Sequence, residues 1–211
     1  MTVPVLQVKN LYKLFIPLEH SQNEKKAMAM LEQGASRTEV QEATGITAGL
    51  IDINFTVNKS EVFVLIGLSG SGKSTLMHAM SGLDRPEQGE VVIDGENILK
   101  LKQKAVDKFR AEKIGFIFQS FFIQGNESVY DNVSLPLEIA DVPRSKRKAR
   151  VDAALAAVEL SEKVKNKAKD LSGGQKQRLA IARAIANEPD IIFADEPTGN
   201  LDSVTGEKVE E

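Results

Sequence analysis

The stretch GLSGSGKST, residues 67–75, constrains this chain more than any other segment. It has the spacing G-x-x-x-x-G-K-[ST], with Gly67, Gly72, Lys73 and Ser74 at the fixed positions. Glycines let backbone N–H groups turn inward around phosphate oxygens, because no Cβ stands in the way. The apolar run VFVLIG (62–67) predicts a buried strand of a parallel sheet before the motif, and a helix is expected after it. The sequence therefore predicts a strand, a phosphate-binding loop and a helix whose N-terminus adds partial positive charge.

Two side chains of this motif carry the expected chemistry. Lys73 is predicted to reach the β- and γ-phosphates of a nucleotide, and the Ser74 hydroxyl to bind Mg²⁺. A glycine-rich turn with a chance lysine is the alternative interpretation. The apolar run before the motif and the helix expected after it argue against that alternative.

A second constellation lies near the end of the chain, where IIFADEP places Asp195 and Glu196 after an apolar run. In open parallel sheets, ligands bind at the carboxyl ends of the strands. Asp195 is therefore expected to hold Mg²⁺ through its water shell, and Glu196 to polarise an attacking water as a general base. Acidic pairs are common in surface turns, so this signal depends on its combination with the phosphate loop.

Strands and helices alternate along the chain, which predicts an α/β fold. Strands are expected over 3–8, 50–57, 89–95, 114–120 and 190–195, and helices over 101–112, 145–158 and 179–186. Residues 21–44 differ from the rest. Ser21 with Glu24, and Ser36 with Glu39, match the pattern that caps a helix start, and Gly34 ends the first helix. We interpret 21–44 as a helical hairpin inserted between two strands; a solvated loop with helical bias is the alternative.

Composition excludes several classes of protein. The chain has 211 residues, a net charge of −3 and no cysteine, so no disulfide or thiolate metal site can form. Its histidines, His20 and His78, lie far apart in sequence. No apolar run approaches the roughly 20 residues that span a bilayer. Nothing in the charge balance marks a nucleic-acid binder, and the basic cluster at 143–150 fits a solvated helix face.

The string LSGGQKQRLAIARAIANEPDIIFADEPTGNLD (171–202) narrows the choice further. LSGGQ opens a predicted helix whose serine and glycines can present N–H groups to an anion. With the phosphate loop and the acidic pair, it resembles the nucleotide-binding domain of ATP-binding cassette (ABC) transporters over essentially the entire chain. The resemblance implies a single domain over 1–211 with a P-loop NTPase core: a mostly parallel sheet, a small antiparallel β subdomain and a helical signature subdomain at about 120–180.

The resemblance also implies roles for residues that match the family motifs. The Walker A loop would bind ATP through Gly67, Ser69, Gly70, Ser71, Gly72, Lys73, Ser74 and Thr75. The signature residues would bind the ATP of an opposite subunit, through Ser172, Gly173, Gly174 and Gln175. Mg²⁺ would be bound by Ser74, Gln119 and Asp195, and the catalytic residues would be Glu196, Gln119 and Lys73. Asp202 matches the D-loop aspartate. Phe15 aligns with the aromatic residue that stacks on adenine, and Tyr12 is its rival.

The implied activity is ATP hydrolysis coupled to transport. Two such subunits would form a head-to-tail dimer that holds two ATP molecules between Walker A of one and the signature of the other. The conformational change between the closed and released dimer would be transmitted to transmembrane permease subunits. The implied location is cytoplasmic, at the inner or plasma membrane, through those permease subunits. No nucleic-acid partner is expected.

Two parts of the chain resemble different subfamilies of these ATPases. Residues from about 5 to the Walker A loop resemble the glycine betaine/proline importer ATPases, which carry a similar hairpin. From about Met80 onward, segments such as IGFIFQSF and ADEPTGNLDS resemble the macrolide-export and lipoprotein-release ATPases, a type that is slightly favoured. A chain recombined near Walker A, or a subfamily of its own, would explain the mixture.

The family pattern continues beyond the D-loop through a helix and a strand that ends in a switch histidine, whereas this sequence has no histidine after His78. The resemblance places that strand between the Walker A and Walker B strands. Each unpaired backbone group at the resulting gap would cost about 1–3 kcal/mol if buried. We therefore expect a C-terminally truncated cassette, with weak ATP binding and little or no turnover.

Two other function classes remain open. A soluble ABC ATPase would carry two cassettes or a long coiled-coil insertion, and neither is seen in the sequence. A degenerate or truncated nucleotide-binding module with little ATPase activity is the closer alternative. Glu196→Gln distinguishes it from a working ATPase, because only the working enzyme should be trapped as an ATP-bound dimer.

Overall fold

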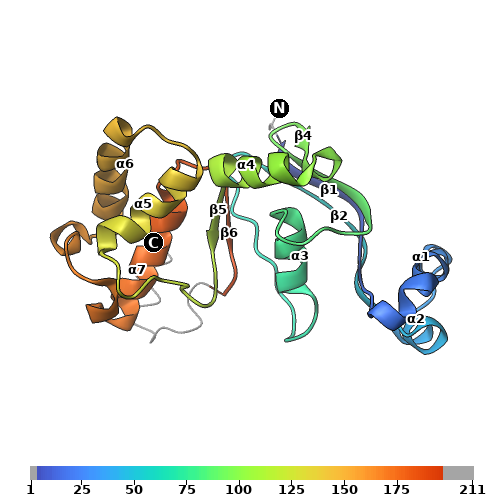
Figure 1. Ribbon diagram of the computed structural model, residues 1–211. Coiled ribbons are helices and arrows are strands. Elements are labelled where there is room, and N and C mark those ends of the chain that lie inside the picture. The colour runs from blue at the N-terminus through green and yellow to red at the C-terminus, as the bar shows by residue number, and fades with distance from the viewer. Residues whose placement is uncertain (1–3, 197–211) are drawn as a thin grey trace. The chain divides into compact units, whose positions relative to one another are not determined.

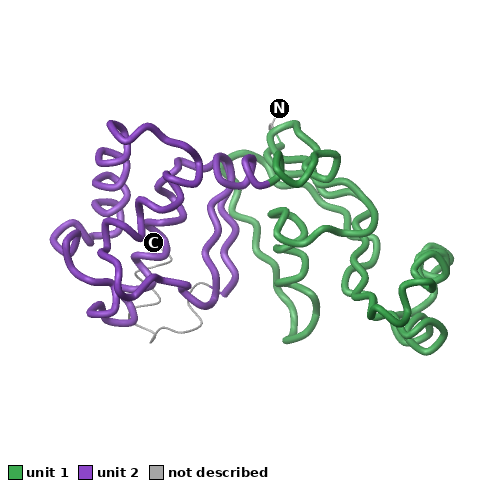
Figure 2. The backbone as a smooth tube through the Cα atoms, in the orientation of Figure 1, with its two compact units in different colours: residues 1–106 green, residues 107–211 purple. Residues whose placement is uncertain are grey.

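The computed structural model describes residues 4–196 and divides into two compact units, with the boundary between Val106 and Asp107 (Figure 2). Each unit has its own β-sheet and its own helices. Asp202 lies outside the described residues.

The first unit is built on a four-stranded antiparallel sheet, in the order β2-β1-β3-β4 (Figure 1). Its strands are β1 (Pro4–Phe15), β2 (Thr47–Asn58), β3 (Gln88–Ile93) and β4 (Glu96–Asn97). The strand expected over 3–8 thus continues to Phe15 and includes both aromatic candidates, Tyr12 and Phe15. In β2, burial alternates between neighbouring residues over much of the strand, as its sequence pattern predicts.

Helices α1 (Glu24–Glu32) and α2 (Arg37–Thr44) occupy the segment between β1 and β2, after the short 3₁₀ helix η1 (Leu18–Asn23). Ser36 and Glu39 form the predicted capping box at the start of α2. The cap predicted at Ser21 is wrong, because Ser21 lies inside η1 and Asn23 precedes α1. The helices bury Ala27, Leu31 and Val40 against the ends of the long strands. That this pair is an insertion stays a prediction.

The strand predicted over 62–67 is wrong. Residues 61–68 are irregular, and within the part of the chain that the structure describes no strand pairs with them. Val62 is 90% exposed and Ile66 is 92% exposed, while Phe63 stacks on Phe55 of β2 with ring centroids 4.8 Å apart. An apolar run becomes a buried strand only where a neighbour satisfies its backbone N–H and C=O groups.

Helix α3 (Lys73–Met80) follows this segment and buries Leu76, Met77, Ala79 and Met80. Beyond β4 come the 3₁₀ helix η2 (Ile98–Lys100) and α4 (Gln103–Lys113), which continues from the first unit into the second. The helix predicted over 101–112 is therefore confirmed with small shifts at its ends.

The second unit pairs two parallel strands, β5 (Ile114–Ile117) and β6 (Ile191–Ala194), as their apolar sequences predict. Its helices are α5 (Val129–Ile139), α6 (Arg144–Ala157) and α7 (Gly173–Ile185), with short 3₁₀ helices η3 (Ser161–Lys163) and η4 (Ala168–Asp170). The three α-helices share one apolar core, which includes Val133, Leu137, Leu155 and Leu179. Helix α7 begins within LSGGQ, as predicted, with Ser172 as its cap, and it is continuous with the helix predicted over 179–186. None of the described helices combines the length and the apolar sequence that are needed to span a bilayer.

Candidate nucleotide-binding site

The phosphate loop lies between the irregular segment and α3. Gly70 and Gly72 have φ values of +77° and +100°, a region that side chains with a Cβ rarely adopt. The Ser71 N–H donates to the Leu68 carbonyl at 3.1 Å, which closes the turn. Gly72 then caps α3, so the helix expected after the motif begins at Lys73.

The Lys73 side chain folds back over this loop. Its Nζ donates to the carbonyl oxygens of Gly67 at 2.9 Å and Leu68 at 3.2 Å. These bonds hold the ammonium group against the loop, where a bound phosphate would be expected to draw it into a charge-assisted interaction. The hydroxyl-bearing residues Ser69, Ser71 and Ser74 are exposed, and Thr75 is half-buried.

The two aromatic candidates at the end of β1 differ in exposure. Tyr12 is 8% exposed and belongs to the apolar core beside α1 and α2, whereas Phe15 is 47% exposed. The Lys13 Nζ lies 6.0 Å from the centroid of the Phe15 ring. Only an exposed aromatic ring can stack on a base, so the exposure favours Phe15 over Tyr12 as the candidate for stacking on adenine.

Lys13 anchors this end of β1 to the segment after α3. Its buried ammonium forms ion pairs with Asp84 at 3.0 Å and Glu87 at 3.3 Å, and donates to the Arg85 carbonyl at 2.8 Å. Burial by itself lowers the pKa of Lys13, but the interactions with Asp84 and Glu87 outweigh it, so the pKa is raised. Glu87 also accepts a hydrogen bond from the Leu14 N–H. No local sequence pattern could predict this network, because its partners lie more than seventy positions apart.

In the second unit, the parallel strands bring two predicted residues together. The Asp195 N–H donates to the Ile117 carbonyl at 2.9 Å, which extends the pairing of β5 and β6. Just beyond it, Gln119 Nε2 donates to Glu196 Oε2 at 2.7 Å. Glu196 has a φ of +46°, a strained value for a residue with a side chain. The strand ends therefore hold the carboxylate proposed as general base against the amide of Gln119.

The signature residues form the start of α7. Ser172 Oγ accepts from the Gln175 N–H at 3.3 Å, and the Ser172 N–H donates to Gln175 Oε1 at 3.0 Å. Gln175 is thus occupied in capping its own helix. A Cβ added at Gly173 would meet no atom within 4 Å, which leaves the first turn open to solvent.

Two residues that the sequence did not single out shape the loop after Gln119. Arg183 of α7 donates to the carbonyls of Phe121 and Phe122, each at 2.7 Å, and burial lowers the pKa of its guanidinium.

Asn132 of α5, itself 1% exposed, accepts from the Gln124 N–H and donates to the Gln124 and Ser128 carbonyls.

The structure places the predicted residues in two groups. Phe15 and residues 67–75 belong to the first unit, and Gln119, residues 172–175, Asp195 and Glu196 belong to the second. Within residues 4–196, no group of three acidic or histidine side chains could hold a metal ion.

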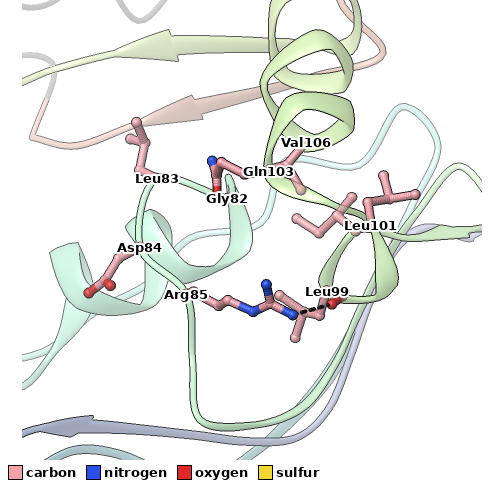
Figure 3. Close-up of a pocket in the computed structure, with 9 residues that line it drawn as sticks. Gly82, Leu83, Asp84, Arg85, Leu99, Leu101, Gln103 and Val106 are labelled. Carbon is pink, nitrogen blue, oxygen red and sulfur yellow. Dashed lines mark hydrogen bonds between the residues drawn. The ribbon is translucent and has the colours of Figure 1, made fainter.

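A small hollow of about 50 Å³ in the first unit involves none of these residues (Figure 3). Leu83, Leu99 and Leu101 line it, and the Arg85 guanidinium donates to the Leu99 carbonyl at 3.1 Å. None of the residues that line this hollow belongs to the phosphate loop.

The ABC transporter family model matches residues 50–199, so the chain belongs to that family. It is 46% identical over 157 residues to an uncharacterised ABC transporter ATP-binding protein of Thermotoga maritima, covering 74% of this chain and 67% of that protein. It is 38% identical over 197 residues to the glycine betaine/proline betaine transport system ATP-binding protein ProV of Escherichia coli. That match covers 93% of this chain but 48% of ProV, so the chain spans about half the length of that relative.

Solved structures show the same fold. The dimeric structure of MJ0796, a bacterial ABC transporter cassette, matches with a TM-score of 0.75 and 36% identity, covering 97% of this chain and 79% of that one. The same cassette in a post-hydrolysis state bound to ADP and Pi matches equally, at a TM-score of 0.75. The predicted P-loop fold of an ABC cassette is confirmed. Among the described residues, parallel pairing is confined to β5 and β6.

Proposed function

We propose that this chain is the ATP-binding and ATP-hydrolysing subunit of an ABC transporter. The observation that carries the proposal is the phosphate loop, where two left-handed glycines and Lys73 lead directly into a helix. The similarity to a cassette solved with ADP and Pi supports a nucleotide ligand. We further propose that residues 1–211 form one nucleotide-binding domain, with 21–44 as an inserted hairpin and about 120–180 as its helical part.

Each predicted residue has a role in this proposal. The backbone of 67–75 and the Lys73 ammonium bind the phosphates, and Phe15 stacks on adenine. Glu196 acts as the general base that polarises the attacking water, and Gln119 positions that water. Ser74, Gln119 and Asp195 offer the oxygen ligands that Mg²⁺ prefers. When bound, Mg²⁺ would neutralise charge that develops on the phosphates. Ser172, Gly173, Gly174 and Gln175 bind the nucleotide of a second subunit, and Asp202 belongs to the D-loop.

The proposed partners are a second nucleotide-binding subunit and transmembrane permease subunits. The dimeric state of MJ0796 and the transport names of the relatives support them. Such a subunit acts on the cytoplasmic face of the membrane, which it reaches through the permease.

For the transport type, we propose the macrolide-export or lipoprotein-release group, on the basis of the segments after Met80. The similarity to ProV over 93% of the chain supports the betaine-import alternative. Co-purification with each kind of permease distinguishes the two, since only the matching permease should retain the chain.

A nucleotide-binding module with little turnover is the second candidate function. The observation that favours it is the exposed, unpaired segment 62–67 directly before the phosphate loop. A loop without a strand behind it is less rigidly held, and catalysis depends on precise positioning more strongly than binding does.

ATP binding and hydrolysis by the purified chain test the proposal. Lys73→Ala should abolish ATP binding, and Glu196→Gln should retain binding but lose turnover and accumulate an ATP-bound dimer. Binding without turnover in the unmodified chain would favour the second candidate function. An unmodified chain that binds no ATP would contradict both.

A further inference from the structure

Gly49 occupies an irregular point in the pairing of β1 with β2. Lys13 pairs with Leu50 and Leu14 with Ala48, so Gly49 has no partner of its own across the ladder. This is a β-bulge, a feature that redirects neighbouring side chains. Gly49 is buried, and its φ lies outside the left-handed region, so its backbone could also accommodate alanine.

What requires glycine at this position is the Phe15 ring. A Cβ added at Gly49 would lie 2.7 Å from Phe15 Cε2 and 3.4 Å from Cδ2. The first distance is shorter than carbon atoms tolerate, so the ring rests where an alanine methyl would stand. Because Phe15 is half-exposed at the end of β1, the cheapest response to a methyl group is movement of the ring itself.

The carbonyl of the same residue contacts two further elements. Arg37 Nη2 donates to the Gly49 oxygen at 3.1 Å. Arg37 is the first residue of α2, where the Ser36–Glu39 capping box fixes the helix start. On the phosphate loop, a Cβ added at Gly72 would lie 3.1 Å from the Gly49 oxygen, so the two backbones approach closely. The Phe15 ring, the start of α2 and the end of the phosphate loop thus meet at one residue.

From this convergence we infer that Gly49 is a positioning residue, which sets the Phe15 ring at a fixed place relative to the phosphate loop. The inference rests on the proposed function and assigns Gly49 to the recognition of the base. Arg37 holds Gly49 in place through the hydrogen bond to its carbonyl, and this bond links α2 to the proposed base-binding site. The phosphates are bound by other groups, so Gly49 affects selection of a nucleoside triphosphate over inorganic triphosphate.

The experiment compares the dissociation constants for ATP and inorganic triphosphate, each with equal Mg²⁺, in the full chain. Gly49→Ala should weaken ATP binding about tenfold, the scale of one lost base–aromatic stack, and leave triphosphate binding within twofold. Arg37→Gln should give a smaller loss of the same kind. Gly125→Ala is the matched control, because its new methyl would meet only Lys169 at an ordinary 3.4 Å.

A double-substitution cycle makes the test specific to the ring. Phe15→Ala should weaken ATP binding as Gly49→Ala does, and the two together should weaken it no more than Phe15→Ala alone. Additive losses, or an equal loss for triphosphate, overturn the inference. A chain that prefers ATP to triphosphate, but whose Gly49→Ala variant binds both normally, overturns the inference and leaves the proposed function standing. A chain that binds neither ligand overturns the proposed function and the inference with it.

Discussion

The segments 62–67 and 191–194 have similar apolar sequences but different surroundings. Residues 191–194 form β6, which pairs in parallel with β5 and buries Phe193 to 6% exposure. Residues 62–67 have no described strand beside them, and Phe63 is 43% exposed. The difference lies in whether a neighbouring strand is available, since both segments have the composition of a buried strand.

The two groups of predicted site residues therefore rest on supports of different strength. Gln119 and Glu196 follow paired strands and contact each other directly. The phosphate loop follows an unpaired segment, and Lys73 donates hydrogen bonds to carbonyl oxygens of the same loop.

The largest expected effect is on the two phenylalanines. Phe193→Ala should lower the free energy of unfolding by about 3–5 kcal/mol, because it removes a fully packed ring. Phe63→Ala should cost about 1 kcal/mol or less, because it loses one stack at a half-exposed site. Denaturant unfolding of both variants measures the difference. Equal losses would show that 62–67 is buried in solution.

A smaller effect is expected at Gly115 of β5. An alanine Cβ there would lie 2.7 Å from the Ala184 carbonyl oxygen and 3.1 Å from Pro189, so backbone has to move. Gly115→Ala should destabilise the chain by about 1–3 kcal/mol. Gly125→Ala serves as control and should change the midpoint of unfolding little. If both variants unfold alike, close packing of α7 on the parallel strands is not what holds them.

On the other side of the comparison, Lys13→Met tests the anchor of the antiparallel sheet. It should cost about 2 kcal/mol at pH 7, because Asp84, Glu87 and the Arg85 carbonyl lose a charged donor. The folded pKa of Lys13 is raised above the ordinary 10.5, so its contribution is present below that pH and is lost as pH rises through the folded value. The gap between wild type and Lys13→Met should therefore stay constant from neutral pH and narrow only in strong alkali. A gap that closes between neutral pH and the ordinary pKa of lysine would contradict the ion pairs.

The smallest effect is expected within 62–67 itself. Val62→Lys places a charge at a position that is 90% exposed, so the free energy of unfolding should change by no more than about 0.5 kcal/mol. Thermal and denaturant unfolding of this variant check the exposure directly. A loss of several kcal/mol would mean that another strand covers the segment.

Local patterns predicted much of the secondary structure. The Ser36 capping box, the alternation in β2 and the apolar runs of β5 and β6 are all present. The cap at Ser21 failed because a 3₁₀ helix competes for the same residues. Gly49 precedes the strand predicted over 50–57, so neither its place inside β2 nor its contacts could be predicted from the sequence.

By itself, the sequence determined the family, the glycine geometry of the phosphate loop and the order of the motifs, because these depend on residue type and short spacing. Only the tertiary structure decided which apolar run became a paired strand, which aromatic ring stayed exposed and which carbonyl Arg37 binds. Those outcomes depend on neighbours far away in the chain, since backbone pairing, burial and close approach are properties of two segments rather than one.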